Sequence, residues 1–189
     1  MYDIFDCVDS FEKMLDIKYY LILGRKGRQV HLIVKFNKND CFHLMGLQYL
    51  KDRPQLKRDR GKIFDEIRLR NIDKRVIESS DYYNQIENRI NFLPHLEELF
   101  DSNETVFKYN KKLNNYSMIE ADYLMKNQWK EKNIFIFLSK RLENEYFCRS
   151  FFLQGKVNEI IQEIRLHGLC YLRKKLKFPR KKKKFYMID

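Results

Sequence analysis

The sequence predicts a single α+β domain, with an N-terminal helix and β-hairpin, a helical middle, and a curved antiparallel sheet of about four strands. Three observations predict it. Apolar residues recur at helical spacing near the N-terminus and again between residues 59 and 102. Strand-like runs of β-branched and aromatic residues dominate from residue 105 onward. With 189 residues, 44% of them hydrophobic, the chain is long and apolar enough to bury one full core.

The N-terminal elements are expected to be one helix and one hairpin. Residues 3–15 place six apolar side chains at helical spacing, namely Ile4, Phe5, Val8, Phe11, Met14 and Leu15. Residues 18–23 and 29–36 are strand-like runs. The turn between them, residues 24–28, is bounded by glycines and contains three cations, which predicts a β-hairpin with a basic tip.

The middle of the chain is expected to be helical. Residues 37–40 are predicted to form a turn and helix cap that leads into a short helix over residues 41–50, which stops before Pro54. Residues 59–102 continue the helical spacing. Within them, residues 79–81 (Ser-Ser-Asp) form a cap and Pro94 occupies a natural first position of a helix.

The second half of the chain changes to the period of strands. The predicted strands cover residues 105–109, 118–125, 133–138 and 145–152. A short helix is expected over residues 156–166 and a last strand over residues 169–172. The domain is therefore expected to span residues 1–176, and residues 177–189 are predicted to form a basic, flexible tail.

Charge is the main global signal, and most of it lies at the C-terminus. The chain has 38 Lys and Arg against 26 Asp and Glu, a formal net charge of +12. Residues 173–189 contain nine of these cations and one acid, Asp189, so the other 172 residues carry only about +4. Such a charge block predicts binding to an anionic polymer, a nucleic acid, but it does not locate a site of chemistry.

The residues expected to contact nucleic acid lie in three places. The hairpin tip and the C-terminal segment supply cations for phosphates, and Trp129, in a basic segment, offers a ring on which a base could stack. An anchor at a hairpin end is the alternative role for Trp129. The predicted contacts are Arg25, Lys26, Arg28, Trp129, Arg173, Lys174, Lys175, Lys177, Arg180, Lys181, Lys182, Lys183 and Lys184.

Several classes of protein are disfavoured. The four cysteines, Cys7, Cys41, Cys148 and Cys170, form no CxxC pair, which disfavours a zinc finger and fits free thiols in a reducing cytosol. The N-terminus lacks the pattern of a secretory signal, and no apolar run approaches the ~20 residues of a membrane helix. No P-loop, dinucleotide fingerprint, GxSxG elbow or metal-ligand constellation is present, so we expect a cytoplasmic protein with no cofactor, no metal and no membrane partner.

Three segments of the sequence resemble a known family. They are residues 42–47 (Phe-His-Leu-Met-Gly-Leu) just after the hairpin, residues 120–125 leading into the strand at 134–138, and residues 149–152 (Arg-Ser-Phe-Phe). Together, over residues 10–175, they resemble the fourth phage-associated nuclease-like family of the barnase–EndoU–colicin–RelE group.

The resemblance implies a barnase/RelE-like fold and metal-independent cleavage of RNA, so RNA is expected as the partner rather than DNA. It maps the family's His-x-x-Gly-Leu motif onto His43, Gly46 and Leu47, and its strand serine onto Ser150. One departure is residues 156–166, which read as a helix where the family has a more strand-like, basic segment.

Cleavage of this kind needs a proton acceptor and donor and a fixed cation. His43 is the candidate general acid or base because histidine titrates near neutrality, although a helix histidine bonded to a neighbouring carbonyl is the alternative. Arg149 and Ser150 are the second candidate pair. Because successive strand residues point to opposite faces, only one of them is expected to share a face with any given site. Lys140 could hold phosphate, with a solvated turn as its alternative.

The leading hypothesis is a metal-independent endoribonuclease of the toxin or phage-interference type. It would cleave RNA by attack of the 2′-hydroxyl, with His43, Arg149, Ser150 and Lys140 as catalytic residues and a protein inhibitor or antitoxin as a candidate partner. The alternative is a non-catalytic nucleic-acid-binding accessory protein, or an inhibitor acting on a nucleoprotein complex, whose function depends on the basic tail.

Overall fold

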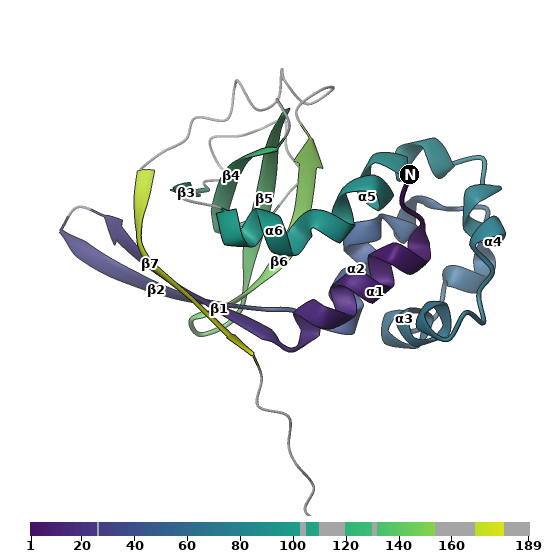
Figure 1. Ribbon diagram of the computed structural model, residues 1–189, viewed down its shortest axis with the longest axis horizontal. Helices are drawn as coiled ribbons and strands as arrows, with labels where there is room; N and C mark the ends of the chain where they lie inside the picture. Colours follow the sequence, from purple (N-terminus) through teal and green to yellow (C-terminus); the bar gives the residue numbers. More distant parts are fainter. Residues whose placement is uncertain (26, 103–104, 110–119, 130–131, 154–168, 180–189) are drawn as a thin grey trace, which may run out of the picture.

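The computed structural model describes residues 1–25, 27–102, 105–109, 120–129, 132–153 and 169–179, although the side chains of residues 25, 129, 132, 169–175 and 179 are not among the features described (Figure 1). The helices of this part are α1 (Ile4–Leu15), α2 (Lys38–Met45), α3 (Arg60–Arg68), α4 (Lys74–Glu78), α5 (Glu87–Phe92) and α6 (Leu96–Ser102). Short 3-10 turns are η1 (Leu47–Tyr49), η2 (Pro54–Leu56), η3 (Tyr83–Gln85) and η4 (Leu93–His95). The strands are β1 (Ile17–Arg25), β2 (Arg28–Lys35), β3 (Thr105–Lys108), β4 (Tyr123–Trp129), β5 (Lys132–Leu142), β6 (Glu145–Leu153) and β7 (Leu169–Pro179). This order confirms the α+β class.

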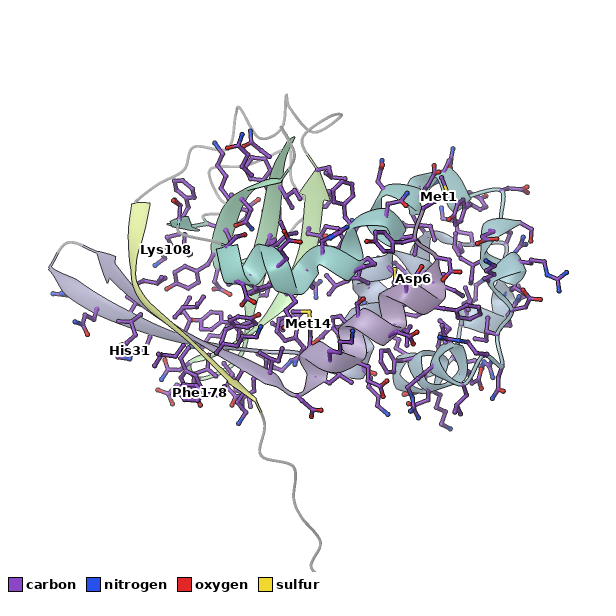
Figure 2. The ribbon with its side chains drawn as sticks, viewed as in Figure 1. Met1, Asp6, Met14, His31, Lys108 and Phe178 are labelled. Atoms are coloured by element: carbon purple, nitrogen blue, oxygen red, sulfur yellow. The ribbon has the colours of Figure 1, made fainter. Side chains whose placement is uncertain are left out.

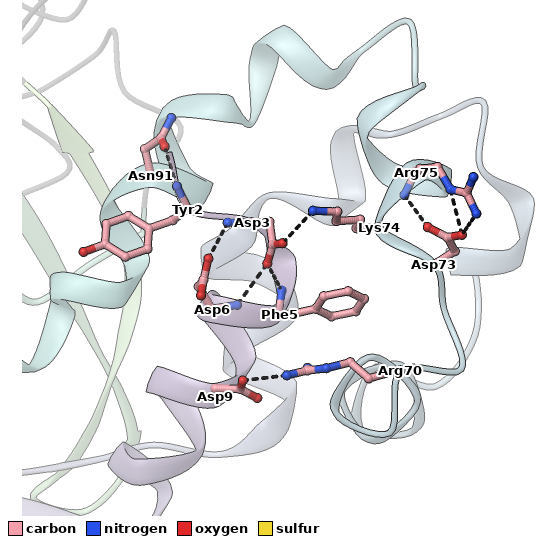
Figure 3. A network of polar contacts seen from close by, with 10 residues as sticks. All are labelled: Tyr2, Asp3, Phe5, Asp6, Asp9, Arg70, Asp73, Lys74, Arg75 and Asn91. Atoms are coloured by element: carbon pink, nitrogen blue, oxygen red, sulfur yellow. Dashed lines mark hydrogen bonds and ion pairs between the residues drawn. The ribbon is translucent and has the colours of Figure 1, made fainter.

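Local sequence signals explain the N-terminal helix. Asp3 and Asp6 form a capping box, in which the Asp3 carboxylate accepts from the backbone of Phe5 and Asp6, and Asp6 accepts from the backbone of Asp3. Two ion pairs then tie α1 to the segment around α3 and α4, Asp3 to Lys74 at 3.2 Å and Asp9 to Arg70 at 2.6 Å (Figure 3). These contacts hold the helical layer together at the end of the molecule remote from the hairpin (Figure 1).

The sheet is larger than the sequence predicted. Among the described residues, seven strands pair in the order β1-β2-β6-β5-β4-β3-β7, and β7 returns to β1 to close a barrel. Every pairing is antiparallel except that of β2 with β6, which is parallel at Ile33 with Glu145 and Val34 with Tyr146. The expectation of about four antiparallel strands is therefore wrong. The cause is long-range pairing, since the N-terminal hairpin joins the same sheet as the C-terminal strands.

Strand β7 also extends into the segment expected to be a tail. Its residues 177–179 pair in register with Tyr19, Lys18 and Ile17 of β1. The Lys177 ammonium contacts the carboxylates of Glu97 at 2.5 Å and Asp101 at 2.8 Å. Lys177 is thus a structural residue of the barrel closure. Residues 180–189, the rest of the expected tail, lie outside the described residues, as does the helix predicted over 156–166.

The helices cover the barrel and create the junction at which the candidate site lies. Helix α2 packs against α3 and β6, α5 packs against α2 and β6, and α6 lies against β4 (Figure 1). The main core runs through both layers and includes Phe11, Phe36, Phe64 and Phe100. A smaller cluster of Tyr109, Leu124, Phe135 and Phe137 packs separately in the strands. Residues of α2, α3, α5 and β6 are consequently brought together from distant parts of the chain.

Candidate functional site

His43 lies near the end of α2 and faces α3. The helix begins where the backbone of Asn37 donates to the Asp40 carboxylate at 2.8 Å, and it ends at Gly46. The half-buried His43 imidazole receives the Arg60 guanidinium at its Nε2 atom. Arginine can only donate hydrogen bonds, so Nε2 is the acceptor and the imidazole proton lies on Nδ1. The partner of Nε2 is therefore the Arg60 guanidinium and not a neighbouring carbonyl.

The surroundings of His43 favour the neutral ring. Partial burial lowers the pKa of His43 below its usual 6.5, and the positive charges of Arg60, Arg149 and Arg89 lower the pKa further. A neutral imidazole at neutral pH can accept a proton. Three cations around a single proton acceptor also form a site of positive potential, which suits an anionic substrate.

Gly46 combines a left-handed backbone conformation with close neighbours on its Cα. Its φ of +82° lies in the left-handed region that disfavours other residues. A Cβ at this position would lie 2.9 Å from Cδ of Arg89 and 2.9 Å from Cγ2 of Ile86. The absence of a Cβ at Gly46 therefore leaves room for the Arg89 side chain, which comes from α5. The group that approaches Gly46 closely is this arginine.

Arg89 is a buried cation held by neutral partners. It exposes 8% of its surface. Both of its terminal nitrogens lie 3.4 Å from the Ser150 hydroxyl, and one lies 3.5 Å from the Leu44 carbonyl oxygen. Its guanidinium also lies 5.0 Å from the centre of the Phe152 ring. Within the described part of the chain, no Asp or Glu forms an ion pair with Arg89, and burial lowers the pKa of its guanidinium below the usual value.

Sequence reasoning missed Arg89, although one signal pointed to it. Ile86, Ile90 and Leu93 mark the buried face of the α5 region, and Arg89 falls on the same face by spacing. A charged residue at a core position is rarely retained without a partner or a function. That anomaly could have identified Arg89 as a candidate before the structure was known.

A β-bulge in β6 lies at Arg149, beside Ser150. Two successive residues of β5 pair with Ser150 and Cys148, so Arg149 is the extra residue of the bulged strand. The bulge also shifts the burial pattern, since Cys148 and Phe151 are buried while both residues between them are not. The bulge interrupts the alternation of faces on which the prediction for this pair rested, and that only one of the two residues serves the site stays a prediction. Ser150 contacts Arg89, and the charge of Arg149 acts on His43.

Lys140 lies on β5, where it pairs with Tyr146 of β6. Its backbone donates to the Asp122 carboxylate at 2.7 Å, and its side chain is exposed. Lys140 and Arg149 both line a surface pocket of about 410 Å³, together with Asp122 and Glu120 among others. The structure thus groups His43 with Arg60, Arg89, Arg149 and Ser150. Lys140 joins this group through the pocket that it shares with Arg149, not through a contact with His43.

The predicted nucleic-acid contacts are only partly described. Arg28 is exposed on β2, and Lys177 is engaged by two carboxylates. The backbones of Arg25, Trp129, Arg173, Lys174 and Lys175 lie in strands, but their side chains are outside the described set, and Lys26, Arg180, Lys181, Lys182, Lys183 and Lys184 lie outside it entirely. His31, by contrast, is exposed on the hairpin, far from the helical end of the molecule (Figure 2).

Three further observations concern chemistry elsewhere. Cys7, Cys41 and Cys148 are buried and unbridged, and burial raises the pKa of each thiol. Within the described ranges, no group of three or more His, Cys, Asp or Glu side chains is placed to hold a metal ion. A search of the same ranges for a helix that is long and apolar enough to cross a membrane finds none.

One comparison with known proteins agrees with the motif, and two, with curated proteins and with solved structures, found nothing similar. The family model described as phage-Barnase-EndoU-ColicinE5/D-RelE like nuclease4 matches residues 3–187. The match includes α2 with His43, α5 with Arg89, and the bulged strand β6. Because it covers nearly the whole chain, the protein belongs to this family of phage-associated nuclease-like proteins.

Proposed function

We propose that this protein is a metal-independent endoribonuclease in which His43 moves the protons and Arg149 stabilises the transition state. The observation that carries the proposal is the half-buried His43 imidazole, which contacts Arg60 and whose pKa is lowered by burial and by the charges of Arg60, Arg149 and Arg89. Proton transfer from a ribose hydroxyl requires such an acceptor, and the doubly charged phosphorane requires adjacent cations.

The reaction would proceed by internal attack within the RNA. The 2′-oxygen bonds to the neighbouring phosphorus, and its proton passes to Nε2 of His43. The bond from phosphorus to the 5′-oxygen then breaks, and the imidazolium returns the proton to the leaving 5′-oxygen. The products are a 2′,3′-cyclic phosphate and a 5′-hydroxyl, so protons and electrons balance without another reactant.

Arg60 has to move for this chemistry to occur. In the unbound structure its guanidinium occupies Nε2 of His43, the atom that would accept the 2′-proton. A substrate phosphate offers Arg60 a charged acceptor, and charge-assisted hydrogen bonds are roughly twice as strong as neutral ones. Binding of RNA would therefore draw Arg60 onto the phosphate and release Nε2 for catalysis.

The remaining predicted residues take supporting roles in the proposal. Ser150 would position Arg89, whose buried charge adds to the field at His43. Lys140 would hold a neighbouring phosphate at the rim of the pocket that it shares with Arg149. Each of these residues acts at a distance from the reacting bond, so each should contribute less than His43.

The cellular role that we propose is that of a toxin or phage-interference ribonuclease acting in the cytoplasm. The phage-associated family supports this role, as does the harm that an unrestrained ribonuclease would do to the cell that makes it. The same argument implies a protein inhibitor or antitoxin as a partner.

The test is cleavage of a generic RNA in EDTA by the wild type, His43→Ala and His31→Ala. We expect the wild type and the His31 control to cleave and His43→Ala to lose about 10²–10⁴-fold in rate, the usual contribution of general acid–base catalysis. Equal cleavage by both variants, or no cleavage by the wild type, would overturn the assignment.

A non-catalytic nucleic-acid-binding role is the second candidate, favoured by the concentration of nine cations in residues 173–184. Truncation separates the two roles. The cut must follow Pro179, because a cut after Leu172 removes the part of β7 that pairs with most of β1. A nuclease keeps turnover on short RNA without residues 180–189, whereas a binder that relies on its tail loses its function.

A further inference from the structure

A second pocket lies between the end of α2 and the start of α3. It has a volume of about 310 Å³ and is lined by residues of α2, η1, η2 and the segment leading into α3. Arg60, which contacts His43, is one of its walls. We call it the basic pocket, and its lining includes Phe42, Leu56, Lys51, Lys57 and Arg60. It adjoins the candidate site directly.

The cations of the basic pocket fall into two groups. Arg58 is committed to Glu66 at 2.7 Å and 3.0 Å, and Arg53 pairs with Asp52 at 2.8 Å. These two arginines therefore support the walls. Lys51 and Lys57 are exposed, and within the described residues neither forms an ion pair with a carboxylate. Both ammonium groups are available to an anion from solution.

The floor of the basic pocket is apolar. Phe42 and Leu56 line it and expose 6% and 3% of their surfaces, respectively. The Arg60 guanidinium lies 5.7 Å from the centre of the Phe42 ring, so that cation and apolar floor are adjacent. An apolar floor below a cationic rim suits a ligand with a flat apolar part and a phosphate, which are the two halves of a nucleotide.

The size of the pocket restricts the form of the nucleic acid. A volume of about 310 Å³ is near the lower end of small-ligand pockets, roughly 300–1,000 Å³. It can take one unstacked base. A base can reach the floor only if it is splayed out of its stack, which is how single-stranded RNA is usually recognised.

We infer that the basic pocket is a subsite for one unstacked nucleotide of single-stranded nucleic acid, flanking the phosphate at His43. Lys51 and Lys57 hold the phosphate of that nucleotide, and its base lies on Phe42 and Leu56. The inference deepens the proposed function and rests on it, because it treats His43 as the reacting centre. It also gives the protein a preference for single strands that the charge of the tail alone would not produce.

The experiment measures binding separately from cleavage. All proteins carry His43→Ala, and a fluorescein-labelled single-stranded oligoribonucleotide is titrated by anisotropy at several salt concentrations. The test variant adds Lys51→Ala and Lys57→Ala. The control adds Lys13→Ala and Lys108→Ala, two exposed lysines on α1 and β3 that remove the same charge from outside the pocket.

We expect the test variant to bind about 25-fold more weakly at 0.1 M salt, and its slope of log K against log salt to fall by about 1.4, since each phosphate contact on a single strand contributes about 0.7. The control should stay within about twofold. Binding of a blunt duplex should not distinguish the two variants. A test variant that binds the single strand like the control, or loses duplex binding equally, overturns the subsite.

Two further measurements separate the inference from the proposed function. Displacement of the oligonucleotide by a nucleoside monophosphate should need less ligand than displacement by inorganic phosphate. Equal potency would refute the base on the apolar floor. With His43 intact, Lys51→Ala with Lys57→Ala should raise KM without changing kcat. If the wild type cleaves no RNA but the test variant still binds the single strand more weakly than the control, the proposed catalysis is refuted and the nucleotide subsite is supported.

Discussion

Gly46→Ala should destabilise the protein by an amount that the structure allows to be divided into two parts. The left-handed φ of +82° costs a residue with a Cβ roughly 1–2 kcal/mol. The added methyl would also lie 2.9 Å from both Arg89 and Ile86, and overpacking of this kind costs about 1–3 kcal/mol. The free energy of unfolding should therefore fall by about 2–5 kcal/mol.

Gly27 provides a matched control within the same chain. Its φ is +76°, but a Cβ there would meet nothing within 4 Å. Gly27→Ala should therefore show only the backbone cost of roughly 1–2 kcal/mol. Equilibrium unfolding in urea measures both variants, and the difference between them isolates the clash. If Gly46→Ala lowers the free energy of unfolding no more than Gly27→Ala does, the close contact of Gly46 with Arg89 does not explain why a glycine occupies this position.

Three other predictions follow from the same geometry. The pKa of His43, followed by NMR titration of its ring protons, should lie below 6.5 and should rise in Arg60→Gln, because a neighbouring positive charge is removed; an unchanged pKa would contradict the electrostatic account. Arg89→Met replaces a buried charge with an apolar side chain, so the free energy of unfolding should stay unchanged or rise by up to about 1–4 kcal/mol. The kcat/KM for RNA should fall in the same variant. A variant that is both less stable and fully active would show Arg89 to be structural. Truncation after Leu172 should lower stability strongly because β7 closes the barrel, whereas truncation after Pro179 should leave the urea midpoint nearly unchanged, and equal midpoints would contradict the role of β7.

Local signals in the sequence were sufficient for the elements and for part of the site. The apolar spacing of residues 3–15 and the glycine-bounded turn at 24–28 predicted α1 and the hairpin correctly, because helix and hairpin formation depend on neighbouring residues. The motif placed His43 beside Gly46 for the same reason. These are features that a few consecutive side chains determine.

Long-range pairing explains what could not be predicted. A bulge at Arg149 depends on the register between β5 and β6, and no local pattern reveals it. Residues 177–179 look like a basic tail by composition, yet they pair with β1, more than 150 positions earlier in the chain. Arg89 reaches the site only because α5 packs against α2 and β6. In each case a partner distant in sequence decides the outcome.

Attack by a ribose 2′-hydroxyl, driven by His43, can be followed on a substrate that contains one such group. Four DNA oligonucleotides, each with a single ribonucleotide of a different base, are incubated with the wild type in EDTA, and the products are weighed by mass spectrometry. We expect cleavage immediately 3′ of the ribonucleotide, with a 2′,3′-cyclic phosphate on one product and a 5′-hydroxyl on the other. Cleavage at deoxynucleotide positions, or products that bear a 5′-phosphate, would contradict it.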